Sequence, residues 1–220
     1  MRRVFRENSL SIVLFGLFAV MLFGQSVSGH RSYNEDQQAH GQPAVGFVEY
    51  LGTGHFVESV FENWESEFLQ MSAFVLFTIF LRQKGSPDSK PLEGSEPSDA
   101  DPSKGKRANV SRPVRRGGLV LVLYENSLTI ALFLLFVISL VLHALGGARA
   151  HNAEQLEHGG ATVSTAGYVM TSRFWFESLQ NWQSEFLSVG ALTVLSIVLR
   201  QKGSPQSKPV AAPNDETGTG

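Results

Sequence analysis

The chain has 220 residues, a formal net charge of −2 and no cysteine. The lack of cysteine excludes disulfide bonds, thiolate metal sites and a cysteine nucleophile. A net charge so close to zero gives no basis for expecting a nucleic-acid partner. The length allows one or two domains.

The two halves of the chain repeat one another. When Glu7 is aligned with Glu125 without a gap, 38 of the 86 positions from 6 to 91 carry the same residue 118 positions later. The motif Asn-Trp-x-Ser-Glu-Phe-Leu occurs in both halves, and each copy leads into an apolar run that ends in Arg-Gln-Lys-Gly-Ser-Pro. Identity at this level indicates an internal duplication, so we predict one repeat at 1–91 and a second at 118–209.

Each repeat contains two segments with the length and composition of a membrane span. Residues 10–27 and 128–145 are apolar and uncharged, whereas 64–81 and 182–199 are apolar except for acids in their first turns. About 20 apolar residues cross a bilayer core as a helix. The sequence therefore predicts an all-α membrane protein with four transmembrane helices, arranged as two parallel two-helix repeats.

The first apolar block has an alternative interpretation. Basic residues, an apolar core and small residues near position 29 are also the pattern of a cleaved signal peptide. The same design recurs at 125–147, where a signal peptide cannot lie. We therefore expect both segments to be retained as membrane helices.

The segments outside the repeats are polar and poor in aromatic residues. Residues 92–117 are rich in Ser, Pro, Asp, Lys and Gly, and residues 210–220 consist of small, polar and acidic residues with no aromatic side chain. Such segments bury too little apolar surface to offset their chain entropy. We predict a disordered linker and a disordered tail.

The distribution of basic residues predicts the orientation. Of the 18 Lys and Arg residues, 15 lie in the amino-terminal segment, in 82–117 or in 200–208. Because Lys and Arg accumulate on the cytoplasmic side, both termini and the linker should be cytoplasmic, and the loops at 29–62 and 147–180 should face outward. Two crossings per repeat would give the repeats the same orientation, related by a pseudo-two-fold axis along the membrane normal. The location that follows is the cell membrane.

The second span of each repeat is preceded by an amphipathic stretch. No Gly or Pro interrupts His55–Lys84, so this stretch is either one long helix or an interfacial helix that bends near Asn63. Trp64 and Trp182 are expected as anchors at the outer interface, where indole rings settle. After the span, Gly85 is expected to adopt the left-handed conformation of a helix C-cap.

A polar stripe opens each of these spans. On a helix, residues spaced i, i+3, i+4 and i+7 share one face, and both repeats have polar residues at that spacing. One interpretation is a polar cavity or ion path, because acids avoid lipid; the other is a set of headgroup-level acids that stabilise the helix dipole. We further predict that Arg31 and Arg149 form ion pairs with the two Glu residues of the stripes. The stripe residues are Asn63, Ser66, Glu67 and Gln70 in the first repeat, and Asn181, Ser184, Glu185 and Ser188 in the second.

Metal and enzymatic chemistry have weaker signals. All six histidines lie on the predicted outer side, but only His40 and His158 occupy matching positions, and no His-x-x-x-His pair is present. Imidazole ligands must converge, so we predict no metal site and no cofactor. There is also no Gly-rich phosphate loop or nucleophile elbow, and we expect no enzymatic activity.

The combination of Glu-Asn-Ser-Leu, Asn-Trp-x-Ser-Glu-Phe-Leu and Arg-Gln-Lys-Gly-Ser-Pro, present twice, resembles a family of bacterial membrane proteins catalogued as a domain of unknown function. The resemblance implies a multi-pass bacterial membrane protein, with no activity attached. We expect a structural or interaction component of the membrane, with the lipid bilayer and an unidentified protein as partners. The alternative is a small transporter or channel around Glu67 and Glu185, which would be a homo-dimer because four helices alone rarely enclose a path.

Overall fold

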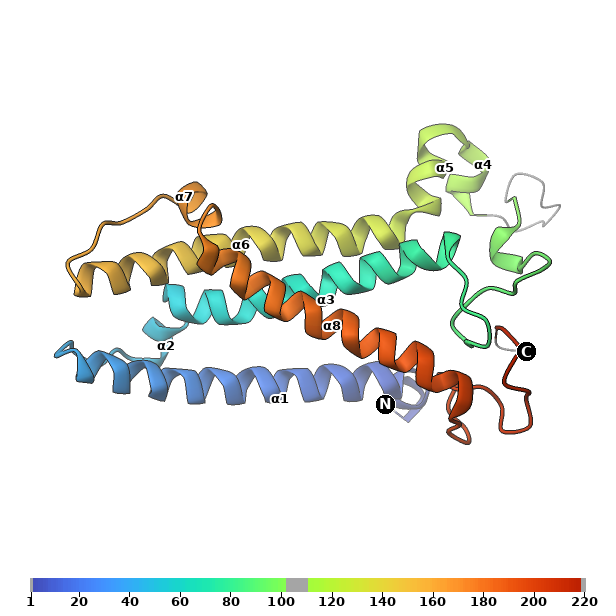
Figure 1. Ribbon diagram of the computed structural model, residues 1–220, viewed down its shortest axis with the longest axis horizontal. Helices are drawn as coiled ribbons and strands as arrows, with labels where there is room; N and C mark the ends of the chain where they lie inside the picture. The colour runs from blue at the N-terminus through green and yellow to red at the C-terminus, as the bar shows by residue number, and fades with distance from the viewer. Residues whose placement is uncertain (1, 102–110, 219–220) are drawn as a thin grey trace. The chain divides into compact units, whose positions relative to one another are not determined.

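In a computed structural model, residues 2–101 and 111–218 are described, and every regular element in these two ranges is helical (Figure 1). The all-α class predicted from the sequence is confirmed for this part of the chain. In chain order the helices are α1 (Arg2–Ala39), α2 (Phe47–Tyr50), α3 (Gly54–Phe80), the 3-10 helix η1 (Pro97–Asp99), α4 (Arg112–Arg116), α5 (Gly118–Glu125), α6 (Ser127–Glu157), α7 (Thr165–Val169) and α8 (Ser172–Val198).

The chain divides into two compact units. The first unit comprises residues 1–61 and 141–174, and the second unit comprises 62–140 and 175–220. Helices α3, α6 and α8 contribute residues to both. The units are described separately below.

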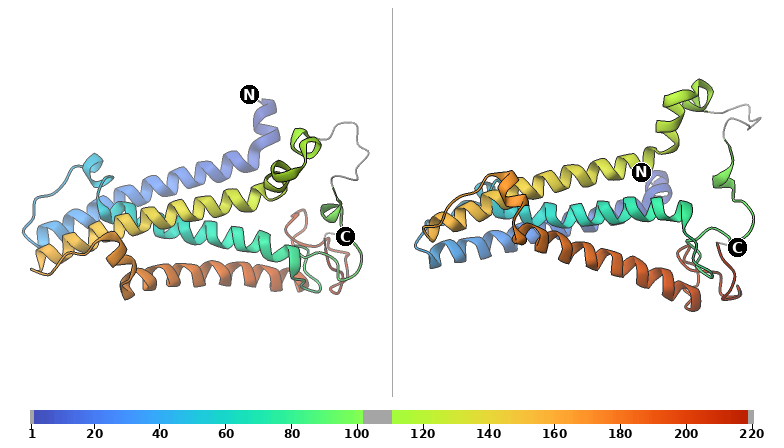
Figure 2. Two further views of the ribbon diagram at one scale, coloured as in Figure 1. Left: turned by 90° about the horizontal axis from the view of Figure 1, so that it is seen from above. Right: turned by 45° about the horizontal axis from the view of Figure 1, so that its top comes forward.

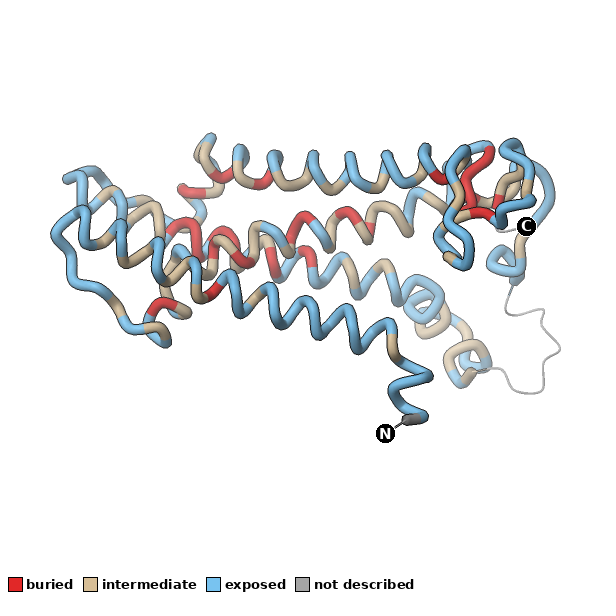
Figure 3. The backbone as a smooth tube through the Cα atoms, turned by 90° about the horizontal axis from the view of Figure 1, so that it is seen from below, coloured by how far each residue is buried: buried red, intermediate tan, exposed pale blue. Residues whose placement is uncertain are grey.

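Two helices are long and apolar enough to cross a membrane within the described ranges: α1 over Arg3–Ala39 and α6 over Ser127–Glu157. Only 6% of the most apolar window of α1 is buried, and Figure 3 shows the exposed class along most of this helix. Large apolar side chains such as Leu10 and Phe15 are more than 70% exposed. A helix with this surface is typical of one that lies in lipid. Helices α3 and α8 do not meet the same criteria of length and apolarity. The second and fourth predicted spans therefore stay a proposal.

The helices extend further than the predicted spans. Helices α1 and α6 continue through polar residues to Ala39 and Glu157, about three turns beyond the ends of their apolar blocks at 27 and 145. Helix α3 is one uninterrupted helix of 27 residues, Gly54–Phe80, and a bend near Asn63 stays a prediction. The apolar pattern in the sequence locates the apolar part of each helix, but it does not locate the end of the helix.

Matching asparagines interrupt the first helix of each repeat. Asn8 has non-helical dihedrals (φ −131°, ψ 19°), and its side-chain amide donates to the carbonyl oxygen of Val4 at 3.0 Å. Asn126, at φ −105°, donates in the same way to the Val122 carbonyl at 2.8 Å and separates α5 from α6. Each Asn side chain thus adds a hydrogen bond to the carbonyl four residues earlier, at the interruption of the helix.

The chain following α3 and α8 forms the same turn twice within the second unit. Gly85 and Gly203 both have φ +86°, which confirms the left-handed conformation predicted for Gly85. The backbone N–H of Gln83 donates to the Ser89 hydroxyl, and that of Gln201 donates to the Ser207 hydroxyl. The retained Arg-Gln-Lys-Gly-Ser-Pro motif therefore encodes a specific turn.

The tail of the chain makes hydrogen bonds in the second unit. Lys208 is 2% exposed, and its ammonium group donates to the carbonyl oxygens of Pro213, Asn214 and Glu216. The backbone N–H of Gly218 donates to the carbonyl of Ser86 at 2.9 Å. The Lys208 ammonium group thus contacts three carbonyl oxygens of the tail, and the disorder predicted for 210–220 stays a prediction. This clustering does not depend on an apolar core.

The described part of the predicted linker contains two short helical elements. Within 92–117 the structure has η1 and α4, and Lys90 pairs with Asp99 of η1. Both short helices have a proline in their first turn, where its fixed φ favours helix initiation. The prediction of disorder for 102–110 lies outside the described residues.

Candidate functional site

The first unit contains all six histidines of the chain, at positions 30, 40, 55, 143, 151 and 158. It is built by two loops that return along the helix they follow: α2 after α1, and α7 after α6 (Figure 2). The way these loops are held determines where the polar side chains meet.

Each returning loop is pinned by an asparagine. The side chain of Asn34 accepts from the Val45 backbone N–H at 2.8 Å and donates to the Val45 carbonyl at 3.0 Å. Asn152 makes the same two bonds to Val163, at 2.8 and 2.9 Å. Each asparagine side chain thus satisfies both the backbone N–H and the backbone carbonyl of the loop valine, as a neighbouring backbone segment would. Asn34 and Asn152 occupy matching positions in the two repeats, and so do Val45 and Val163.

A buried tyrosine closes each loop against a glycine. Tyr50 and Tyr168 are 1% and 0% exposed. A Cβ atom added to Gly29 would lie 2.2 Å from the Tyr50 hydroxyl, and one added to Gly147 would lie 2.5–2.7 Å from the Tyr168 ring and hydroxyl. Only glycine allows the ring to approach the helix so closely.

Helices α3 and α6 approach one another backbone to backbone in the first unit. A Cβ atom on Gly54 would lie 2.5 Å from the Ala150 nitrogen, and one on Gly146 would lie 2.6 Å from the Glu58 nitrogen. Small residues at such a crossing let two helix backbones come into contact. This contact places Glu58 of α3 beside the inner face of α6.

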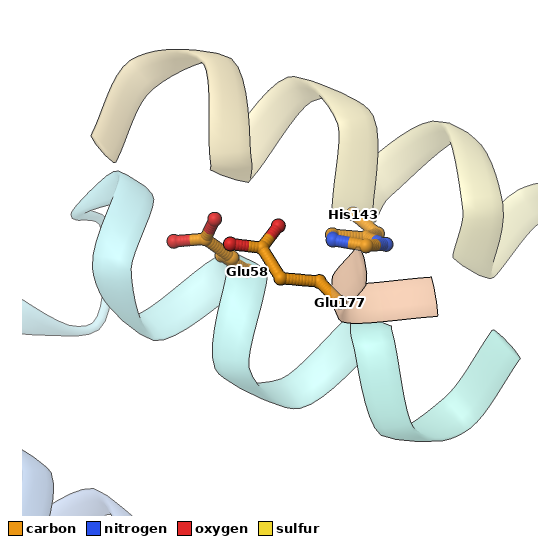
Figure 4. Close-up of side chains that lie close together, drawn as sticks. All are labelled: Glu58, His143 and Glu177. Atoms are coloured by element: carbon orange, nitrogen blue, oxygen red, sulfur yellow. The ribbon is translucent and has the colours of Figure 1, made fainter. Parts of the chain in front are cut away.

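Glu58 is a buried carboxylate. It is 8% exposed, and the hydroxyl of Tyr168 donates to its Oε1 at 3.0 Å. Figure 4 shows its side chain near that of His143, and a ring nitrogen of His143 lies within 4.8 Å of a Glu58 carboxylate oxygen. His143 is fully buried and stacks on Phe174 with ring centroids 4.9 Å apart. Burying an acid is costly unless it is hydrogen-bonded, and the Tyr168 hydroxyl supplies such a bond to Glu58.

Glu58 also borders a pocket of about 240 Å³ that lies entirely within the first unit. Four acids contribute to its lining but only two guanidinium groups. One of these, Arg173, pairs with Glu154 at 2.5 Å and lowers the pKa of that carboxyl group by hydrogen bonding. The pocket therefore has an excess of negative charge. Its ionisable lining consists of Asp36, Glu58, Glu154, Glu157, Arg149, Arg173, His40, His55, His158 and Tyr33.

The polar stripes predicted from the sequence lie in the second unit and do not border this pocket. Ser66 and Gln70 are buried, whereas Asn63 and Glu67 are exposed. The Ser66 hydroxyl donates to the Asn63 carbonyl, three residues earlier in its own helix, at 2.7 Å. In the second repeat, Ser184 and Ser188 bond to Asn181 and Glu185 in the same way. The role of the stripes as an ion path stays a prediction.

In the second unit the fully buried acid is Glu65, a neighbour of the stripe. It is 0% exposed and accepts a hydrogen bond from the indole N–H of Trp182 at 3.1 Å. The Trp182 ring packs edge-to-face on Phe136 at 6.3 Å. Trp182 thus has a partner inside the protein, and the interfacial anchoring expected for it and for Trp64 stays a prediction.

The predicted partners of the stripe acids lie in the first unit. Arg31 and Arg149 are exposed, and Arg149 lines the pocket. Because Glu67 and Glu185 belong to the second unit, the predicted ion pairs are left to experiment.

Sequence reasoning missed Glu58 and the pocket. The amphipathic pattern places Glu58 on the polar face of its helix, which for an isolated helix means water. The available signal was the shared set Gly29/Gly147, Asn34/Asn152 and Tyr50/Tyr168, which marks the loops that build the first unit.

The chain belongs to a family defined by a domain of unknown function (DUF6766), whose model matches residues 1–219. No curated protein and no solved structure matches the chain. Family membership adds no activity, so a functional proposal depends on the geometry of the first unit.

Proposed function

We propose that this member of the DUF6766 family is a multi-pass protein of the bacterial cell membrane that binds a small cation in the pocket of its first unit. The single observation that carries the proposal is the lining of that pocket, where carboxylates outnumber guanidinium groups two to one. A recess whose lining has an excess of one sign of charge attracts ions of the opposite sign. The proposed role is binding rather than catalysis.

The membrane part of the proposal has four spans, formed by α1, α3, α6 and α8. Support comes from the exposed apolar surface of α1 and from the composition of α6. The apolar second half of α3 supplies a further surface for lipid, and its last residue Phe80 and the following Leu81 are both more than 60% exposed. The positive-inside rule favours cytoplasmic termini and an outward position for the loops at 29–62 and 147–180, which contain all the residues that line the pocket.

The buried pair of Glu58 and Tyr168 gives the pocket a fixed inner wall. The carboxylate is held by a hydroxyl donor at 3.0 Å, and its helix is locked to α6 through Gly54 and Gly146. A site whose polar groups are already oriented loses less entropy when a ligand binds. We therefore propose that Glu58 lies at the inner end of the cation site.

The test is cation binding by the full chain in detergent or nanodiscs. Binding of Na⁺, Ca²⁺, Zn²⁺, Cu²⁺ and spermidine would be measured by calorimetry and by the shift in the thermal midpoint. A ligand at 100 times its Kd stabilises the folded state by about 2.7 kcal/mol. At least one of these cations should bind saturably, and Glu157→Gln should weaken its binding. The matched control, Glu93→Gln, changes an exposed acid of the second unit.

Equal binding by both variants would place the cation elsewhere. No saturable binding of any cation would refute the proposal. The structural or interaction role expected from the sequence would then be the account that remains. The transporter alternative has its own test, because replacing both Glu67 and Glu185 by Gln should abolish flux in reconstituted vesicles.

A further inference from the structure

We propose that His40 and His158 together bind one first-row transition-metal ion, Zn²⁺ or Cu²⁺. This inference rests on the proposed cation-binding function and names the class of ion. The two histidines border the same pocket and are the histidines that occupy matching positions in the two repeats. Each repeat would therefore supply one ligand from the same structural position.

The backbone holds both histidines in the same way. His40 follows the last residue of α1, and His158 follows the last residue of α6. The next residue in each case is a glycine, Gly41 at φ +71° and Gly159 at φ +70°. The N–H of Gln42 donates to the Gln37 carbonyl at 2.8 Å, the long bond of a Schellman cap. The second repeat has the same bond, from Gly160 to Gln155, at 2.7 Å.

One nitrogen of each imidazole is committed to the backbone. Nδ1 of His40 lies 2.9 Å from the carbonyl oxygen of Asp36, and Nδ1 of His158 lies 2.9 Å from that of Glu154. A carbonyl oxygen can only accept, so each Nδ1 must carry the hydrogen. In the neutral imidazole the lone pair is then on Nε2. A hydrogen bond of this kind from the second ring nitrogen is what orients histidine ligands in metal sites.

The spacing of the two rings suits a shared ion. Their centroids are 5.7 Å apart, and the planes meet at 69°. With metal–nitrogen distances of about 2.0–2.1 Å, two imidazoles on one tetrahedral ion have ring centres roughly 5 to 6 Å apart. The separation of 5.7 Å falls within this range, so the two rings are close enough to share one ion.

The surroundings favour a cation over a second role for the histidines. Asp36, Glu154 and Glu157 line the same pocket, and the ends of α1 and α6 add the negative ends of two helix dipoles. Imidazole is a ligand that Zn²⁺ and Cu²⁺ accept readily, and water or a carboxylate can complete the coordination. Helix capping explains each histidine alone, but it does not explain why the two rings meet.

The sequence alone argued against a metal because no two histidines share a helix at ligand spacing. His40 and His158 are 118 positions apart, and only the packing of α1 against α6 in the first unit brings them together. Figure 2 shows the ends of these two helices side by side.

The test is metal binding by the full chain in detergent, purified without a polyhistidine tag and stripped with a chelator. One equivalent of Cu²⁺ should give an electron paramagnetic resonance spectrum with coupling to two nitrogens, and Zn²⁺ should compete for the site. His40→Ala and His158→Ala should each lower the Cu²⁺ affinity at least tenfold and remove one nitrogen coupling. His158→Gln is the second variant at that position, and thermal midpoints check that all variants fold.

His151→Ala is the matched control, because His151 lies in the first unit but does not border the pocket. It should leave affinity and spectrum unchanged. An unchanged Cu²⁺ affinity in both His40→Ala and His158→Ala would overturn the site. Saturable binding of Ca²⁺ or spermidine without any binding of Zn²⁺ or Cu²⁺ would overturn this inference and leave the proposed cation binding intact, whereas no binding of any cation would overturn both.

Discussion

Replacing Gly146 by alanine tests the contact that organises the first unit. The added Cβ would lie 2.6 Å from the Glu58 nitrogen, 2.9 Å from Val57 Cγ1 and 3.0 Å from the Val57 carbonyl carbon. Cβ contacts under 3.0 Å essentially never occur in proteins. Two of the three atoms are backbone, so α3 must move away from α6 to make room. That movement would also displace the buried Glu58 carboxylate from Tyr168.

Two opposing terms set the magnitude. Alanine gains about 0.5–1 kcal/mol over glycine inside a helix, whereas overpacking a close contact costs about 1–3 kcal/mol or more. At Gly146 the overpacking term should dominate. After the alanine gain is subtracted, the net cost is up to about 2.5 kcal/mol. For a chain of this length, each kcal/mol corresponds to roughly 2–4 °C in the thermal midpoint, so Gly146→Ala should lower the midpoint by up to roughly 10 °C.

The assay is thermal unfolding in detergent, followed by the intrinsic fluorescence of the three tryptophans. Gly24→Ala is the matched control, because a Cβ at this position of α1 has nothing within 4 Å. It should leave the midpoint unchanged or raise it slightly. If Gly146→Ala behaves like Gly24→Ala, the backbone contact between α3 and α6 is not present in the folded protein.

Three further perturbations test single interactions. Tyr168→Phe removes a donor to the buried Glu58 and should cost about 1–3 kcal/mol in denaturant unfolding; a neutral effect would mean that water satisfies the carboxylate. Burial lowers the pKa of His55 from its ordinary 6.5. The unfolded chain therefore binds more protons than the folded chain just below that pH, and the stability of the fold should decline as the pH falls below about 6.5. The decline should be smaller in His55→Gln, and an equal decline in the variant would mean that other groups cause it. Arg31→Ala and Glu67→Gln should each destabilise the protein, and the double variant should cost less than their sum, whereas additivity would argue against the predicted ion pair.

The sequence predicts the apolar helices and the turns better than it predicts the site. Uncharged blocks at 10–27 and 128–145 locate α1 and α6, because membrane-length apolarity depends on composition alone. Gly85 is predicted in the left-handed region and is found at φ +86°, because glycine followed closely by proline has few alternatives after a helix.

The sequence does not predict what tertiary packing decides. Glu58 is assigned to a polar face, and it is buried because Gly54 and Gly146 let α6 cover that face. His40 and His158 are isolated in the sequence and meet only in the folded first unit, at the ends of α1 and α6. Both the burial of Glu58 and the contact between the two histidines depend on residues far apart in the chain, so a local sequence pattern does not predict them.

The most direct test of the account is the side of the membrane on which each unit's markers lie. The chain has no cysteine, so single cysteines can be placed at Gln38 of α1 and at Ser98 of η1, both of which are exposed. A membrane-impermeant maleimide should label Gln38→Cys in intact cells and Ser98→Cys only after the membrane is permeabilised. Labelling of Ser98→Cys in intact cells would contradict the proposed membrane topology, and protection of Gln38→Cys would contradict a cation pocket that faces outward.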